Sequence, residues 1–344
     1  MFNLQEFQEY VQMNLKSVLP EKYRDVTIDL NQIQKNNGKT LHAMNVYNAE
    51  STIAPTIYME GYFQKYQESA RLDNLMVEIA RVAVENMNPP IEFGTIAEDF
   101  KEFDCVKDKI IMVAVNTERN RSMLANMPHQ NREDLSLIYK VIVRSDHDGI
   151  ATIAIKNEHM NYWGVTEDEI HDVAMQNSKE KLPITIQSMN EIMKEMFSGE
   201  GMPADMAEAM FEEMPMNQQM YVISNTSKIN GAAAMFYEDA LSGLAEQMGT
   251  DLFILPSSIH ECIAVSTDME TPESLAEMVQ EVNGSQVPED ELLSDHVYIY
   301  NAKERTISLA DTTMAQIEAK VSENAQNYEG AETNVEGNRP RHHR

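Results

Sequence analysis

Hydrophobic positions in residues 1–90 change from the period of a helix to that of a strand and back. Apolar side chains recur at helical spacing up to Leu15, which predicts an amphipathic helix. Extended runs over 26–33 and 40–47 follow, and the Asn36-Asn37-Gly38 run between them tolerates the positive φ of a hairpin turn. Helical spacing then returns twice. We therefore expect a helix, a hairpin and two further helices.

The middle of the chain repeats the order of strands before a helix. A continuous apolar run over 110–115 is typical of a buried strand. Runs over 135–143 and 150–155 predict another hairpin. Thr166 and Glu169 have the spacing of a capping box, which predicts that a helix begins there.

Residues beyond 220 show the same elements once more. An apolar pattern over 237–248, followed by Gly249, predicts a helix with a glycine just past its end. Short buried strands are predicted over 252–255 and 262–265. A Thr-Pro pair at 271–272 then supplies an N-cap and a proline at the first position of another helix.

This mixed order predicts an α+β fold with mixed or largely antiparallel sheets built from strand-pair-then-helix units. A doubly wound parallel sheet would require strict alternation of strand and helix. The expected divisions are an N-terminal α+β portion, a central α+β portion, an acidic methionine-rich segment, a C-terminal α+β portion and a disordered tail, which span residues 1–90, 91–188, 189–220, 221–310 and 311–344.

Composition places the chain among globular proteins. Hydrophobic residues make up 42% of its 344 residues, and no apolar run approaches the twenty residues of a membrane span. The first residues lack the basic cluster and apolar run of a secretory signal, and two cysteines without a CxxC pair fit a reducing compartment. We therefore expect a cytoplasmic protein without membrane association.

Negative charge is concentrated in one region. Residues 186–300 hold 21 acidic residues against two lysines, a net charge of −19 out of −29 for the whole chain. Such a surface repels phosphate, so direct binding of nucleic acid is not expected. A solvated acidic face explains the pattern most simply. A basic protein partner, or mimicry of nucleic acid toward a DNA-binding protein, are the alternatives.

The methionine-rich segment, residues 189–220, holds nine methionines, among them Met193, Met206 and Met210. Methionine is unbranched and polarizable, so helices here offer an adaptable apolar surface for a partner. An acidic linker with incidental methionines is the simpler interpretation, and ligation of monovalent copper is a third one.

The best candidate for catalytic chemistry is the turn predicted between two strands. His260 with Glu261 is the candidate base, and the candidate nucleophile is Ser257, Ser258 or Cys262, if the side chains converge. Adjacent residues of a strand point to opposite faces, so the alternative is a turn in which Ser257 satisfies backbone groups. Ser257, Ser258, His260 and Glu261 are also candidate binding residues.

Other motifs give little support for a cofactor or metal. Nucleotide-binding loops, zinc-protease, serine-hydrolase and EF-hand patterns do not occur in the sequence. His147 lies between two aspartates and is a possible ligand, but Asp-His-Asp-Gly is also common at a hairpin tip. No cofactor and no metal site are therefore predicted.

Residues 251–261, together with Asn225 and 231–233, resemble a domain-of-unknown-function family of Gram-positive gut bacteria. Residues 163–183 followed by residues 221–307 are distantly similar to the corresponding segments of the YtpQ-like proteins of bacilli. The resemblance implies a bacterial cytoplasmic protein and points to the turn at residues 256–261. It implies no activity and no catalytic residue.

These observations together favour a non-enzymatic protein that binds another protein, basic in charge, through its acidic C-terminal half. A hydrolase or transferase with its site at residues 256–262 is the first alternative, and nucleic-acid mimicry is the second. Oligomeric state does not follow from the sequence.

Overall fold

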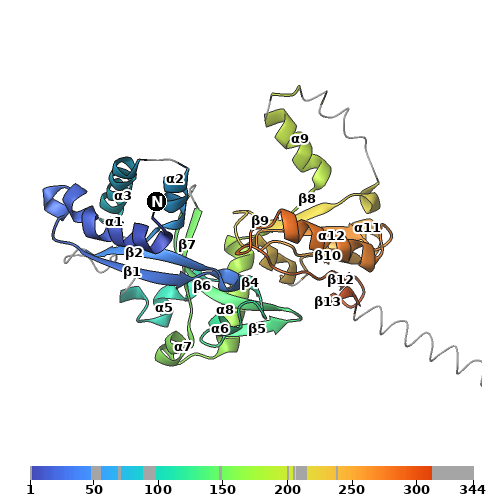
Figure 1. Cartoon of the computed structure of the whole chain (residues 1–344). Coiled ribbons are helices and arrows are strands. Elements are labelled where there is room, and N and C mark those ends of the chain that lie inside the picture. The colour runs from blue at the N-terminus through green and yellow to red at the C-terminus, as the bar shows by residue number, and fades with distance from the viewer. Residues whose placement is uncertain are drawn as a thin grey trace, which may run out of the picture. The chain divides into compact units, whose positions relative to one another are not determined.

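The computed structural model describes residues 2–47, 56–68, 71–87, 98–146, 149–199, 201–203, 206, 215–237 and 239–311. Contacts divide the chain into two compact units, here called unit 1 and unit 2. Unit 1 comprises 1–130, 138–177 and 289–291, and unit 2 comprises 131–137, 178–288 and 292–344. The described elements form an α+β fold with three antiparallel sheets (Figure 1), which confirms the predicted fold class.

In unit 1, three helices lie on one side of a three-stranded sheet (Figure 1). The strands pair in the order β1-β2-β3. The apolar faces of helices and sheet form one core, in which Phe7, Met44 and Ile79 are fully buried. The elements are α1 (Leu4–Val18), η1 (Glu21–Tyr23), β1 (Thr27–Gln34), η2 (Asn36–Gly38), β2 (Thr40–Tyr47), β3 (Thr56–Tyr58), α2 (Glu60–Gln67) and α3 (Leu72–Asn86).

The hairpin between β1 and β2 turns within the three residues 36–38 that the sequence indicated. Asn37 and Gly38 have φ values of 57° and 73°, in the left-handed region that glycine and asparagine enter most easily. All eight residues of β1 pair antiparallel with β2, from Thr27 opposite Tyr47 to Gln34 opposite Thr40. The predicted hairpin is confirmed.

A second sheet pairs its strands in the order β4-β6-β5, with β7 beside β6. The amide of Asn177 donates to the carbonyls of Lys107 (2.7 Å) and Ile110 (2.9 Å), which fixes α8 to the start of β4. The predicted capping box is present, because Thr166 and Glu169 bond each other's backbone N–H. The elements are α5 (Phe103–Val106), η3 (Lys107–Lys109), β4 (Ile110–Asn116), α6 (Arg121–Leu124), β5 (His129–Arg132), β6 (Leu135–Asp146), β7 (Gly149–Ala154), α7 (Asn157–Trp163) and α8 (Glu167–Lys181).

Unit 2 is built on a six-stranded sheet with strand order β13-β12-β10-β11-β9-β8. Phe253, Val265 and Ile299 face α12 and form a core with it. Alternate residues point to the other face, where Cys262 contacts η5. The elements are β8 (Ile184–Ser188), α9 (Met189–Gly199), η4 (Met216–Gln218), β9 (Tyr221–Asn225), η5 (Gly231–Phe236), α11 (Ser242–Met248), β10 (Leu252–Leu255), β11 (Cys262–Ser266), α12 (Pro272–Ser285), β12 (Tyr298–Asn301) and β13 (Thr306–Leu309).

The helix predicted over 237–248 is wrong in its first half. Helix α11 begins only at Ser242, because Asp239 adopts a left-handed conformation with a φ of 60°. Tyr237 instead packs in the core, and its hydroxyl donates to the carbonyl of Leu182 at 3.2 Å. Gly249 ends α11 with a φ of 72°, as predicted.

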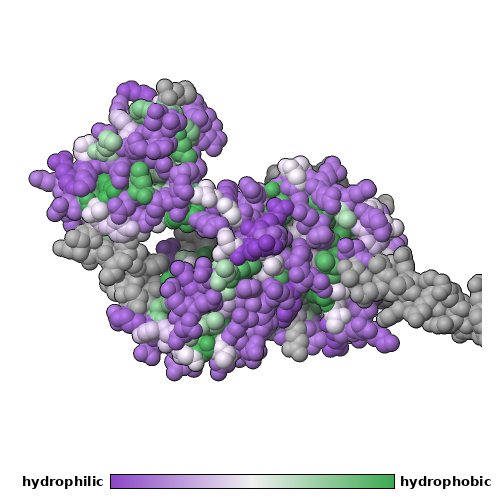
Figure 2. Space-filling view, turned by 60° about the horizontal axis from the view of Figure 1, so that its bottom comes forward, coloured by the Kyte–Doolittle hydropathy of each residue, from purple (hydrophilic) through white to green (hydrophobic). Residues whose placement is uncertain are grey.

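In the face shown in Figure 2, hydrophilic residues predominate and hydrophobic ones form small separate patches. Within the part of the chain that the structure describes, no helix is both long and apolar enough to cross a membrane. The residues predicted as a disordered tail lie, from 312 onward, outside the described ranges.

Candidate functional site

In the turn before β11, Ser258 bonds a backbone group through its side chain and Ser257 bonds one through its own backbone. The hydroxyl of Ser258 accepts a hydrogen bond from the N–H of His260 at 3.1 Å. The carbonyl of Ser257 accepts from the N–H of Leu293 at 2.9 Å, and Ser258 forms a backbone bridge with Leu292. These bonds hold the turn against the chain that follows α12, which is the role of a turn rather than of a nucleophile.

The other candidate residues of this turn point in different directions. His260 is half-buried, and its Nδ1 accepts a hydrogen bond from the N–H of Asn230 at 3.3 Å. Glu261 is exposed, whereas Cys262 is buried with its Sγ 3.8 Å from the carbonyl oxygen of Ala232. Burial raises the pKa of the Cys262 thiol, so the thiol stays protonated and a poor nucleophile. The arrangement favours a structural role for Cys262.

Gly231 fixes η5 against this turn. A Cβ at this position would lie 2.2 Å from the Oγ of Ser224, 2.6 Å from the carbonyl oxygen of His260 and 2.7 Å from the backbone nitrogen of Asn225. The same Ser224 hydroxyl donates to the carbonyl of His260 at 2.8 Å. Glycine is therefore required for the backbones to approach this closely, and the turn is a tightly packed connection.

The methionine-rich segment begins with α9, whose first turn is capped by Ser188 and Glu191. No residue of α9 is fully buried. Met193 is half-buried, Met196 is 51% exposed, and Met206 beyond the helix is 59% exposed. Met210 lies outside the described residues. The described methionines thus leave apolar surface accessible to solvent.

Helix α12 carries a row of carboxylates on its outer side. Glu273, Glu277 and Glu281 are all exposed and follow one another at intervals of four residues, which places them on one helix face. Met278 (41% exposed) and Val282 (36% exposed) lie beside them. We call these five residues the acidic face of α12. The regional charge predicted an acidic surface but not these three glutamates, which their four-residue spacing within the predicted helix could have located.

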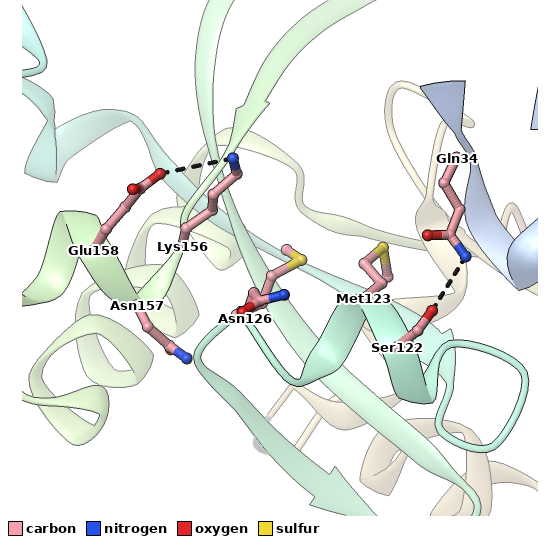
Figure 3. A pocket seen from close by; sticks show the side chains of 8 residues that line it. Gln34, Ser122, Met123, Asn126, Lys156, Asn157 and Glu158 are labelled. Atoms are coloured by element: carbon pink, nitrogen blue, oxygen red, sulfur yellow. Dashed lines mark hydrogen bonds and ion pairs between the residues drawn. The ribbon is translucent and has the colours of Figure 1, made fainter. Parts of the chain in front are cut away.

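A cavity of about 530 Å³ lies within unit 1 (Figure 3). The Nε2 of Gln34 donates to the Oγ of Ser122 at 3.1 Å on one side, and the Nζ of Lys156 lies 3.6 Å from a carboxylate oxygen of Glu158 on the other. Asparagine and methionine side chains complete the lining. Since its two charges face each other, this cavity suits a neutral polar ligand better than an ion.

Within the described ranges, no three His, Cys, Asp or Glu side chains come together in a way that could hold a metal ion. The candidate ligand His147 lies outside those ranges.

Comparison with known proteins yields one finding. No curated protein and no solved structure matches the chain. A family described as "Family of unknown function (DUF5688)" matches residues 4–302. The expected resemblance to a family of unknown function is confirmed at this level, and the bacterial group and the likeness to YtpQ-like proteins stay predictions. Since the match covers most of the length of this chain, the chain belongs to the DUF5688 family.

Proposed function

We propose that the chain is a non-enzymatic, cytoplasmic protein that binds a basic protein partner through the acidic face of α12. The observation that carries this proposal is the pairing of three exposed carboxylates with two exposed apolar side chains on one helix. Helix α12 contains no lysine, arginine or histidine, so no cation of its own neutralises the row.

The chemistry of this face defines the partner. Carboxylates attract lysine and arginine side chains and steer the encounter, and they disfavour acidic partners. Met278 and Val282, one turn apart, provide apolar contact for the side chains of an amphipathic helix. The occupant that fits is therefore a basic amphipathic helix of another protein.

Charge density favours a protein partner over mimicry of nucleic acid. Side chains four residues apart on a helix are about 6 Å apart along its axis. Duplex DNA carries one charge per about 1.7 Å of axis. The row on α12 therefore has less than about a third of the linear charge density that a DNA-binding protein recognises.

Helix α9 gives the same unit a second apolar surface. Met196 is half exposed, and the unbranched methionine side chain adapts to partners of different shape. We propose that α9 adds contact area to complexes formed at α12. A variant lacking residues 189–214 should then bind the partner more weakly without losing its salt dependence.

The test is affinity capture of proteins from a bacterial lysate with the full chain as bait, washed at low and then high salt. The decisive variant neutralises the acidic face (Glu273→Gln, Glu277→Gln and Glu281→Gln). Its matched control neutralises three exposed acids of unit 1 (Glu21→Gln, Asp25→Asn and Glu85→Gln).

We expect one basic protein that both the wild type and the control retain at low salt, and that high salt or the α12 variant releases. Equal retention by wild type and α12 variant would overturn the role of this face. Retention that is unaffected by salt would overturn the electrostatic basis of the proposal.

A further inference from the structure

Unit 2 contains a cavity of about 530 Å³ on the face of its sheet opposite α12. This volume lies in the range of small-molecule sites. Residues on β12 alternate between the two faces. Ile299 packs in the core beside α12, so Tyr300 points to the other side, where it lines the cavity. The remaining walls come from β5, η5, the turn at residues 239–241 and the β12–β13 hairpin.

The hydroxyl of Tyr300 has no hydrogen-bond partner among the described residues, although the side chain is only 4% exposed. Two other buried tyrosines of this unit are satisfied, since Tyr237 donates to the carbonyl of Leu182 and Tyr298 donates to the carboxylate of Asp134. Burial raises the pKa of the Tyr300 phenol, so it keeps its proton and remains a donor. An unmade hydrogen bond of this kind destabilises a protein unless water or a ligand in the cavity completes it.

Two arginines and one carboxylate, that of Asp239, line the same cavity. Arg132 comes from β5 and Arg305 from the β12–β13 hairpin. One guanidinium nitrogen of Arg305 is 2.7 Å from a carboxylate oxygen of Asp239. A guanidinium carries five N–H donors, so this ion pair orients the group and leaves further donors for a ligand.

The backbone beside these charged groups is strained. Asp239 and Arg305 have φ values of 60° and 55°, and Glu133, next to Arg132, has a φ of 56°. Aspartate enters this region more easily than most residues, whereas the left-handed conformations of Glu133 and Arg305 each cost free energy. The surrounding structure therefore holds in place the two turns that carry or adjoin the arginines.

We infer that this cavity binds a small organic anion whose carboxylate or phosphate group is held by Arg132 and Arg305 and accepts a hydrogen bond from Tyr300. Met235, Phe236 and Ile307 line the same space and pack against a short apolar or aromatic body. A planar guanidinium can donate two parallel hydrogen bonds to a carboxylate or a phosphate, which a spherical anion such as chloride cannot accept in the same way. This inference is independent of the protein-binding proposal, because it involves the opposite face of the sheet.

Isothermal titration calorimetry of the full chain tests the inference with three probes. Benzoate and phenyl phosphate supply the two anionic groups on the same aromatic body, and benzyl alcohol is the neutral comparison. We expect one of the two anions to bind at least about tenfold more tightly than benzyl alcohol, because charge-assisted bonds are the stronger ones. Which anion binds more tightly identifies the class of ligand.

Substitutions separate this site from binding elsewhere. Arg132→Gln and Arg305→Lys should each weaken anion binding about tenfold, and Arg305→Lys keeps a positive charge for Asp239 so that the hairpin stays folded. Tyr300→Phe should weaken binding about fivefold while leaving the thermal midpoint unchanged or raised, because it removes an unsatisfied buried group. The control is Arg81→Gln, which replaces an exposed arginine of unit 1 and should change neither quantity.

The inference is overturned if neither anion binds at millimolar concentration. It is equally overturned if the three cavity variants bind as the wild type does, or if Tyr300→Phe lowers the thermal midpoint while binding is unchanged.

Discussion

The replacement Gly231→Ala should destabilise unit 2 strongly. A Cβ at this position would lie 2.2 Å from the Oγ of Ser224, 2.6 Å from the carbonyl oxygen of His260 and 2.7 Å from the nitrogen of Asn225. Two of these three atoms belong to the backbone and cannot rotate away. The hydroxyl of Ser224 is itself bonded to the carbonyl of His260. Strand β9 and the turn before β11 would therefore have to move away from η5.

The expected loss follows from these distances. Overpacking a well-packed interior costs about 1–3 kcal/mol. Because the clash is with backbone on two sides, we expect the upper end, about 3 kcal/mol, which corresponds to a fall in thermal midpoint of about 6–12 °C for a unit of this size. Native-state hydrogen exchange of peptides from residues 221–236 measures the free energy of opening at this place.

Gly284→Ala in α12 is the matched control. A Cβ there meets no atom within 4 Å, and alanine is favoured over glycine within a helix by about 0.8–1.0 kcal/mol. The two identical replacements should thus change stability in opposite directions. If Gly231→Ala leaves the exchange of residues 221–236 as it is in the wild type, the close packing of η5 on the turn is refuted.

Two further predictions concern a thiol and an imidazole. Cys105 is exposed, whereas Cys262 is buried and its pKa is raised. Ellman's reagent should therefore modify Cys105 of the native protein rapidly and Cys262 only after unfolding. Rapid reaction of both thiols would show that Cys262 is accessible. His159 accepts a hydrogen bond at Nδ1 from the Lys156 N–H at 3.1 Å, and burial lowers the pKa of its imidazole. The unfolded chain then takes up a proton at higher pH than the folded chain, so the free energy of unfolding should fall as the pH drops below about 6.5. Urea titrations at pH 7.5 and 5.5 should show a smaller fall for His159→Gln, and an equal fall would remove His159 as its cause.

Elements whose determinants are adjacent in the sequence could be predicted from it. The turn at Asn37-Gly38 and the start of α12 both depend on a few neighbouring residues. The hydroxyl of Thr271 accepts from the N–H of Ser274 at 3.3 Å, and Pro272 occupies the first turn. Such signals work because capping and positive φ are local properties of the chain.

The prediction of a helix over 237–248 was wrong in its first half, because Tyr237 is buried by a contact distant in sequence and not by a helix face. Tyr237 is held by its hydrogen bond to Leu182, 55 residues away in sequence, and Asp239 interrupts the helix and pairs with Arg305. Apolar spacing alone does not separate residues buried by a helix face from residues buried by a distant partner.

The two candidate sites also differ in whether their residues are close in the sequence. The carboxylates of α12 follow from spacing within one helix, so they could be found in the sequence. The cavity in unit 2 could not, because Arg132 on β5 and Tyr300 on β12 belong to different sheets and meet at one cavity only in the folded chain. A hydrogen bond between the same two parts of the chain shows this, because the hydroxyl of Tyr298 donates to the carboxylate of Asp134, 164 residues earlier in the sequence.

The most direct test of the central claim is zero-length cross-linking of carboxylates to amines, with the full chain incubated in bacterial lysate at low salt and the linked peptides identified by mass spectrometry. We predict cross-links that join Glu273, Glu277 or Glu281 to lysines of a single basic protein, and their loss at high salt. Cross-links that avoid α12, or a chain that forms none to any other protein, would contradict the claim that the acidic face of α12 is a docking surface.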